Sequence, residues 1–230
     1  MECVRVLLPA LIETPAQTEM TDKCRRSLDA QITDLCVKIE EDNKRYKTRV
    51  AGVWNAFFDR WRGKDYDYLM IVANDTIADV NAIEYMVKCA KENPNAAMIT
   101  GLVDRDMDNF EKNYGQAAYT SRLTEGLLDP ACFILPKGII EKVGRIDDWF
   151  PMEFVERDYI HRCKLAGYDV IQPDTPLFYH PPYAGTIGND IDRLEAAHRR
   201  YKQKWGGDAN REVFTNPFQD LDLNYTYCHK

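Results

Sequence analysis

Short apolar runs alternate with amphipathic stretches along the first half of the chain. The runs that suit buried strands are Val4 to Pro9, Cys36 to Ile39, Tyr68 to Val72 and Ala96 to Thr100. Between them, apolar residues recur at three- and four-residue intervals, which predicts helices over 21–31, 50–62 and 79–93. Strands that alternate with helices in this way predict an α/β fold, with a central, mostly parallel sheet flanked by helices.

The second half opens with a polar, weakly periodic stretch, 104–129, which predicts a loop or a β excursion over the sheet. Further strands are expected at 131–135, 168–171 and 177–180, and further helices at 138–143, 154–166 and 190–204. An irregular loop is predicted at 11–18 and a polar turn at 40–43. Because no repeat or linker interrupts the pattern, we predict one domain over 1–205 and an irregular tail over 206–230.

Composition is that of a soluble globular protein. Of 230 residues, 45% are hydrophobic and 29% charged, and no apolar run approaches the roughly 20 residues of a membrane helix. The N-terminus shows no signal-peptide pattern, and seven scattered cysteines without CxxC spacing favour reduced thiols and a cytoplasmic location. A net charge of −7 argues against non-specific nucleic-acid binding. The oligomeric state stays open.

Asp75 is the first candidate for chemistry, because it follows the strand 68–72 in a polar turn. The carboxyl ends of parallel strands line the crevice where open α/β sheets bind ligands. A carboxylate there suits a divalent cation and the phosphates that the cation carries. The chain has neither a GxGxxG after its first strand nor a GxxxxGK[ST], which disfavours a Rossmann dehydrogenase and a P-loop NTPase.

Several motifs follow one another in the order of a known enzyme family. A strand ending in Pro9-Ala10, the segment Arg49 to Asn55 and the turn Ala73-Asn-Asp-Thr76 come first. Later motifs are the strand 131–134, Val143-Gly-Arg-Ile-Asp147, Glu156-Arg-Asp158 with Arg162, Ala166-Gly-Tyr168 and a strand ending in His180. From Val4 to Thr186 the chain resembles a family-2 inverting glycosyltransferase of the GT-A fold, in particular the rhamnosyltransferase-like members. Residues 200–207 and 214–218 resemble the tails of some virus-encoded members.

The resemblance implies transfer of a hexosyl or rhamnosyl unit from a nucleotide-diphosphate donor to a glycan or glycoprotein hydroxyl. The expected donor is UDP-linked, and the configuration at the anomeric carbon is expected to invert. The resemblance also implies a nucleotide-binding half, 1–103, and an acceptor or catalytic half, 104–205. The implied donor contacts are Pro9, Ala10, Thr14, Asp42, Arg49, Asn74 and Asp75.

A metal site and a general base are implied as well. Asp75 and His180 are the implied ligands of Mn²⁺, with Mg²⁺ as the alternative, but Ala73 stands where the family's Asp-x-Asp has its first acid. Alignment on Arg162 places Glu156 at the position of the base that deprotonates the acceptor hydroxyl. Asp158 is the alternative base or a ligand of that hydroxyl.

Plainer readings stand beside these assignments. Asp75 suits a turn or a helix cap, His180 a half-buried histidine, Asp42 a solvated acidic run, and Glu156 with Asp158 two acids at a helix N-terminus. The aromatic residues Trp149, Phe150, Phe154 and Tyr183 could form an acceptor platform or core, and the cations of 193–204 suggest a solvated face. The alternative functions are sugar nucleotidyl transfer, disfavoured by the lack of glycine in 11–18, and a non-catalytic sugar-binding module.

Overall fold

A central sheet organises the computed structural model, which describes residues 1–10, 14–42, 50–116, 121–123, 131–150, 154–182 and 191–205. Within these residues seven strands form the sheet, and their bounds are β1 Cys3–Pro9, β2 Cys36–Asp42, β3 Tyr68–Val72, β5 Ala96–Thr100, β7 Ser121–Leu123, β8 Cys132–Pro136 and β9 Asp169–Pro173. Their order across the sheet is β2-β1-β3-β8-β5-β9-β7. The sheet therefore takes strands from both predicted halves of the chain.

Five of the seven strands run in the same direction, so the sheet is mostly parallel, as predicted. Strand β1 pairs in parallel with β2 and β3, and β5 pairs in parallel with β9. Strand β8 runs antiparallel between β3 and β5, and β7 runs antiparallel to β9 at one edge. The carboxyl ends of β1, β2 and β3 consequently meet at one edge of the sheet, where the donor residues were predicted.

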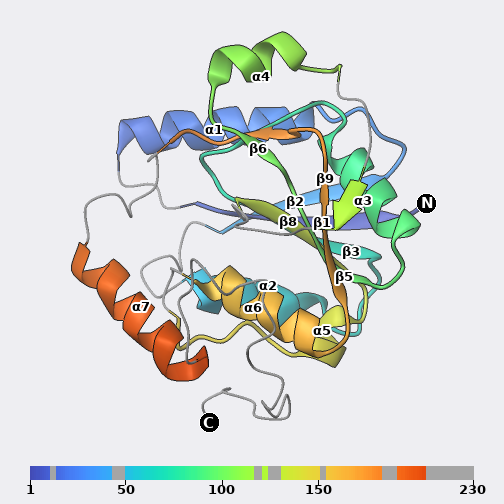
Figure 1. Cartoon of the computed structure of the whole chain (residues 1–230). Coiled ribbons are helices and arrows are strands. Elements are labelled where there is room, and N and C mark those ends of the chain that lie inside the picture. The colour runs from blue at the N-terminus through green and yellow to red at the C-terminus, as the bar shows by residue number, and fades with distance from the viewer. Residues whose placement is uncertain are drawn as a thin grey trace.

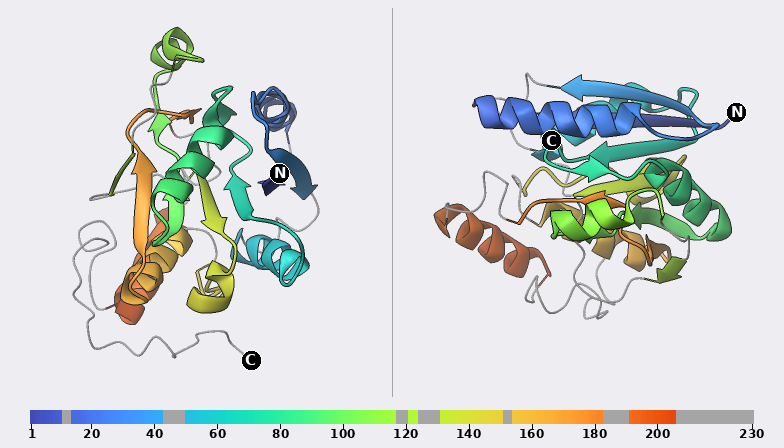
Figure 2. Two further views of the ribbon diagram at one scale, coloured as in Figure 1. Left: turned by 90° about the vertical axis from the view of Figure 1, so that its right-hand side faces the viewer. Right: turned by 90° about the horizontal axis from the view of Figure 1, so that it is seen from above.

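Helices cover both faces of the sheet (Figures 1 and 2). Their bounds are α1 Pro15–Asp29, α2 Val50–Trp61, α3 Ala82–Glu92, α4 Met107–Asn113, α5 Ile139–Val143, α6 Val155–Leu165 and α7 Ile191–Trp205. Helices α1 and α3 lie on one face, while α2, α5 and α6 lie on the other, with α7 beside α6. None of the described helices combines the length and the apolar character that a membrane span needs.

The alternation of side chains along the strands divides the core into two clusters. In β3, Tyr68, Met70 and Val72 pack with α1 and α3, whereas Leu69 and Ile71 pack with α2 and α6. Successive strand residues point to opposite faces, so an uninterrupted apolar run is what a strand buried on both faces requires. This pattern explains why the run 68–72 predicted its strand correctly.

Two element boundaries near the carboxyl edge of the sheet differ from the prediction. Helix α1 begins at Pro15 instead of Thr21, because Thr14 Oγ1 accepts from the Gln17 amide (3.2 Å) and Gln17 Oε1 accepts from the Thr14 amide (2.9 Å). This is a capping box with proline in the first turn. Strand β2 continues through the predicted turn to Asp42, because β1 pairs with it along its whole length, up to Pro9.

The stretch 104–129, predicted as a loop or a β excursion, contains a helix as well as strand β7. Asp106 begins α4 by accepting the amides of Asp108 (3.0 Å) and Asn109 (3.4 Å) at its carboxylate. The cap satisfies amides that a short helix leaves without intrahelical partners. Only Phe110 of α4 is buried, so the apolar period is too weak to be recognised in the sequence.

A second, small sheet sits across the carboxyl edge and carries the later motifs. It consists of β4 Ile77–Ala78, β10 Phe178–Tyr179 and β6 Val103–Asp104, in the order β4-β10-β6. Gly101 joins the two sheets at a point so tight that a side chain there would overlap Cys132 and Phe178. The small sheet thereby brings the residues after β3 next to those after β10.

Candidate functional site

Hydrogen bonds within the turn and to helix α1 hold the turn that carries Asp75. Thr76 Oγ1 donates to the Ala73 carbonyl (2.6 Å), and the Cys24 thiol of α1 donates to the same oxygen (3.5 Å). Burial raises the pKa of Cys24 to about 12, so this thiol stays protonated and keeps its donor. Asn74 Nδ2 donates to Thr21 Oγ1 (2.9 Å), which ties the turn to α1. The backbone around Asp75 is thus fixed.

Asp75 and His180 are brought together by the small sheet. Tyr179 of β10 pairs with Ile77 of β4, so the residues just beyond these strands face each other. His180 Nε2 lies 3.1 Å from Asp75 Oδ1, and each side chain is 16% exposed. The His180 amide also donates to the Asp104 carbonyl of β6 (3.0 Å). The two predicted metal ligands therefore meet across 105 positions of sequence.

This pair offers a metal ion two ligand atoms, one carboxylate oxygen and one imidazole nitrogen. Two neighbouring ligands of an octahedral Mg²⁺, each about 2.1 Å from the ion, lie about 3.0 Å apart. The observed separation of 3.1 Å fits that requirement and also fits a direct hydrogen bond. Within the described residues, no group of three His, Cys, Asp or Glu side chains could hold a metal ion. Among the described residues, this pair therefore offers a cation two ligand atoms, and a phosphate or water could supply others.

Other residues predicted to contact the nucleotide-sugar donor lie at the same edge and differ in their exposure to solvent. Pro9 lies beside Asp42 in the β1–β2 register, and the Ala10 amide donates to the Asp42 carbonyl (3.3 Å). Pro9 and Ala10 are buried, while Asp42 is half-buried. The Thr14 side chain is exposed and serves as the cap of α1. Arg49 lies outside the described residues.

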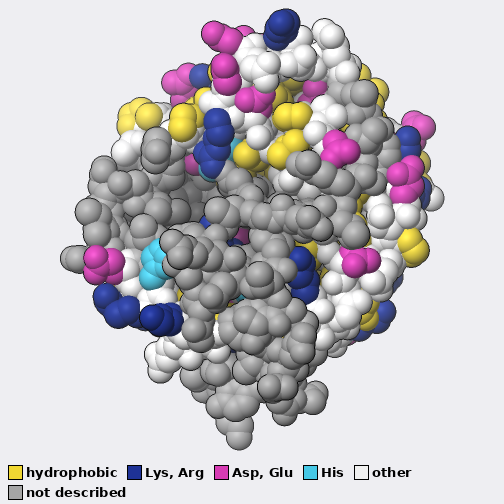
Figure 3. Space-filling view, in the orientation of Figure 1, with side chains coloured by type: hydrophobic (Ala, Val, Ile, Leu, Met, Phe, Trp, Pro, Cys, Tyr) yellow, Lys and Arg dark blue, Asp and Glu magenta, His cyan; other side chains and the backbone are white. Residues whose placement is uncertain are grey.

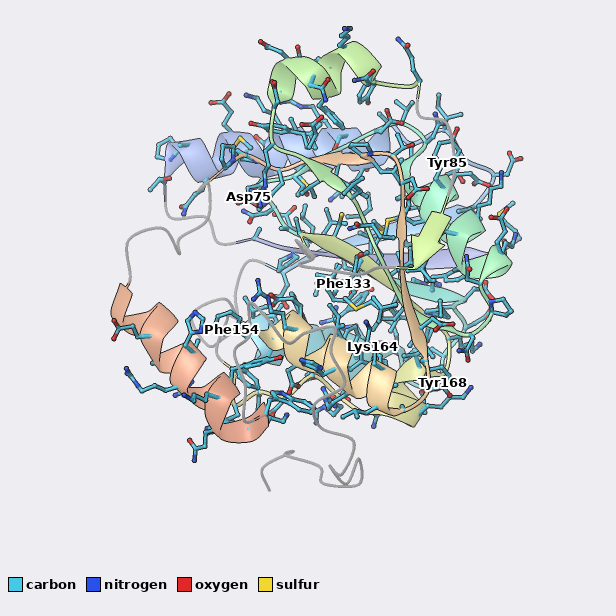
Figure 4. The ribbon with its side chains drawn as sticks, viewed as in Figure 1. Asp75, Tyr85, Phe133, Phe154, Lys164 and Tyr168 are labelled. Atoms are coloured by element: carbon cyan, nitrogen blue, oxygen red, sulfur yellow. The ribbon has the colours of Figure 1, made fainter. Side chains whose placement is uncertain are left out.

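Glu156 and Asp158 belong to the first turn of α6 but face different surroundings. Glu156 is half-buried. In Figure 4, Asp75 and Phe154, the residue just before α6, both lie toward the left end of the sheet, Asp75 in the layer of α1 and Phe154 in the layer of α6. Glu156 follows Phe154 by two residues, in the first turn of α6.

Asp158 is sealed inside the protein, which argues against its predicted role as a base. It has no exposed surface. Its Oδ2 is 3.1 Å from Arg162 Nε, and its Oδ1 is 2.6 Å from Lys204 Nζ and accepts from Trp205 Nε1 (2.9 Å). A carboxylate that two cations and an indole enclose cannot reach an acceptor hydroxyl, so Asp158 is a structural acid.

Of the two alternatives for the aromatic residues, core packing holds for Phe150 and Phe154, and the expected solvated face of 193–204 needs correction at Lys204. Phe150 and Phe154 are buried in the core beside Tyr201, so they are not an exposed acceptor platform; Tyr183 lies outside the described residues. Cations do cover α7 at the lower left of Figure 3, but Lys204 is only 9% exposed. Lys204 falls on the buried stripe with Tyr201 and Ala197, and that helical spacing is the signal that could have placed it inside.

A polar hollow of about 270 Å³ lies between α4 and the segment before β10. Its wall combines an aromatic ring with carboxylates, amides and a hydroxyl, contributed by Phe110, Asp79, Asp104, Asn109, Asn113, Gln116, Thr175 and Pro176. Asp104 belongs to this wall and also accepts the His180 amide through its carbonyl. The hollow therefore adjoins the strand that holds the Asp75–His180 pair in place.

Solved structures resemble the whole fold. One is S. aureus TarS 1–349, at a TM-score of 0.57 and 8% identity over 97% of this chain and 68% of that one. TarS in complex with UDP gives 0.58 and 9% over the same shares. The mannosyltransferase PcManGT from Pyrobaculum calidifontis, in complex with GDP-Man and Mn²⁺, gives 0.58 and 13% over 97% and 70%. The chain has a GT-A fold. No protein-family model and no curated protein sequence matches it.

Proposed function

We propose that the chain is a glycosyltransferase that moves a sugar from a nucleoside diphosphate to an acceptor hydroxyl with inversion. The observation that carries the proposal is the Asp75–His180 pair at the carboxyl edge of β3, within a GT-A fold. This edge is where an α/β sheet binds ligands, and the pair combines the donor types that a phosphate-bound cation prefers.

The donor in this proposal is a UDP-sugar that lies along the edge formed by β1, β2 and β3. Pro9, Ala10 and Asp42 would border its base and ribose, since they meet where β1 and β2 end. The two solved complexes named above hold UDP and GDP-Man, so a nucleoside diphosphate is the shared chemistry of these structural relatives. Arg49 remains a proposed phosphate or ring contact, and Asn74 a proposed ribose contact.

Mn²⁺ or Mg²⁺ would be held by Asp75 and His180 together with the donor's own phosphates. Such an ion neutralises the charge that develops on the leaving diphosphate. Because Ala73 removes one acid from the turn, the protein offers the ion a single carboxylate there. We therefore expect the cation to bind far more tightly with the nucleotide than without it.

Glu156 is the proposed general base. It accepts the proton of the acceptor hydroxyl while that oxygen forms its bond to the anomeric carbon and the bond from that carbon to the diphosphate breaks. Glu156 is only half-buried, so an acceptor can approach it from the surface, in contrast to the sealed Asp158. Attack from the side opposite the diphosphate inverts the configuration.

The test is a panel of UDP- and GDP-sugars, incubated with Mn²⁺ and with simple glycoside acceptors. We expect release of the nucleoside diphosphate and a product heavier by one sugar unit, with inverted anomeric configuration by NMR. A product of retained configuration would contradict the role of Glu156 as base. Pyrophosphate release from a nucleoside triphosphate and a sugar phosphate would instead indicate sugar nucleotidyl transfer.

A further inference from the structure

The second half of the chain contains a buried charge cluster that the proposed reaction does not use. Lys204, in the last turn of α7, places its Nζ 2.6 Å from Asp147 Oδ2 and 2.6 Å from Asp158 Oδ1. Its side chain is only 4% exposed. An ammonium group so far from water is tolerated only where carboxylates surround it closely. The position of α7 is therefore tied to these two acids.

The cluster reaches from α7 through α6 to the segment after α5. Arg162 Nε pairs with Asp158, and the same guanidinium donates to the carbonyls of Val143 (3.2 Å) and Arg145 (2.6 Å). Asp147 Oδ1 accepts the Trp149 amide (2.9 Å). Asp158 stands at the centre, since α7 holds one of its oxygens and Arg162 the other.

The residue that begins α6 is strained, and α7 contacts it as well. Phe154 has a φ of +64°, a left-handed conformation that non-glycine residues adopt only where their surroundings enforce it. Its ring lies 4.6 Å from that of His198 and 5.7 Å from that of Tyr201, both on α7. Helix α7 thus holds the first turn of α6 at Phe154 and again at Asp158.

Glu156 lies midway between these two held points. We propose that α7 is a positioning element for Glu156, with Lys204 as the positioning residue that acts through Asp158. This inference rests on the proposed function, in which Glu156 is the base. A displacement of about 1 Å in a catalytic group can reduce a rate about a hundredfold without altering donor binding. Loosening α7 should accordingly lower kcat and leave the KM for the donor unchanged.

The test separates position from stability by keeping the buried charge balanced. In the double variant Lys204→Met/Asp147→Asn, one cation and one anion disappear together and the Asp158–Arg162 pair remains. The side-chain oxygen introduced at position 147 can still accept the Trp149 backbone amide. We expect an unfolding midpoint near that of the wild type, an unchanged donor KM and a kcat about tenfold lower. Amide hydrogen exchange at 155–158 should become faster. Lys202→Met, an exposed neighbour on α7, is the matched control and should change none of these.

If the wild type and the double variant have equal kcat and equal amide exchange at 155–158, the positioning role is overturned. The proposed function is left intact by that result. A wild type that turns over no donor would overturn the proposed function and this inference with it. If the double variant unfolds, Trp205→Phe replaces it, because it removes the indole donor to Asp158 and keeps an aromatic ring in the core. That variant should show the same fall in kcat at constant KM, and an unchanged kcat would again overturn the positioning role.

Discussion

Asp75 and Asp158 look alike in the sequence, since each is an acid in a short polar motif near the end of a predicted strand or helix. In the structure they have little in common. Asp75 lies at the edge of the sheet, is partly open to solvent and has His180 as its close neighbour. Asp158 has no exposed surface and contacts Arg162, Lys204 and Trp205.

The difference shows how surroundings decide what a carboxylate can do. An enclosed, fully paired acid contributes to stability and order, and it cannot exchange its partners for a ligand without exposing buried charge. An acid beside a histidine at an open edge can take a cation or a phosphate-bound ion at little cost. The two sites should therefore respond in opposite ways to the loss of the carboxylate.

The largest effect is expected for Asp158→Ala. The change leaves Arg162 and Lys204 buried without their common partner, so the free energy of unfolding should fall by about 3–5 kcal/mol. Urea unfolding at pH 7 measures it, and Glu111→Ala on the exposed face of α4 is the control. A loss below about 1 kcal/mol would show that the buried cluster does not hold the protein together.

The next largest effect is expected for the pH dependence of stability, through His161 beside the same buried cluster. Burial lowers the pKa of His161 to about 4, with Lys164 and Lys204 adding to the shift and Asp158 opposing it. The unfolded chain binds this proton near pH 6.5, so stability present at pH 7 is lost as the pH falls toward 4. Between pH 7 and pH 5 the loss is about 2 kcal/mol. His161→Phe should flatten that part of the stability profile, and an unchanged profile would contradict the shift.

Asp75→Asn should produce the opposite pattern to Asp158→Ala. Stability should fall by about 1 kcal/mol or less, because among the described residues Asp75 has one side-chain contact, with His180, and asparagine keeps an oxygen that can form it. Affinity for UDP in the presence of Mn²⁺ should fall at least about tenfold, or about 1.4 kcal/mol, in calorimetry. Chelation of Mn²⁺ should lower the UDP affinity of the wild type and leave the UDP affinity of the variant nearly unchanged. Equal UDP affinity of both proteins would remove Asp75 from the site.

The smallest effect is expected at Thr14, which was predicted to contact the sugar donor but caps α1 in the structure. Thr14→Ala removes the cap of α1 and should cost about 1 kcal/mol of stability in thermal or urea unfolding. UDP affinity should stay the same, because the hydroxyl is used by the helix. A loss of affinity at constant stability would return Thr14 to the donor site.

Strands buried on both faces were predictable, since β3 and β5 carry uninterrupted apolar runs and end at the expected residues. The polar end of β2 was not predictable from the sequence, because residues 40–42 belong to the strand only through their pairing with β1. The Asp75–His180 contact joins positions that no local pattern relates, and only the resemblance indicated it. Lys204 was expected in solvent because lysine usually is, and partners distant in sequence, Asp147 and Asp158, decide otherwise.

The most direct measurement is the rate at which nucleoside diphosphate is released from the preferred sugar donor by the wild type and by Glu156→Gln, side by side with Mn²⁺ and acceptor. We expect a rate about 10²- to 10⁴-fold lower for the variant, with UDP affinity and unfolding midpoint retained. Equal rates for the two proteins would contradict it.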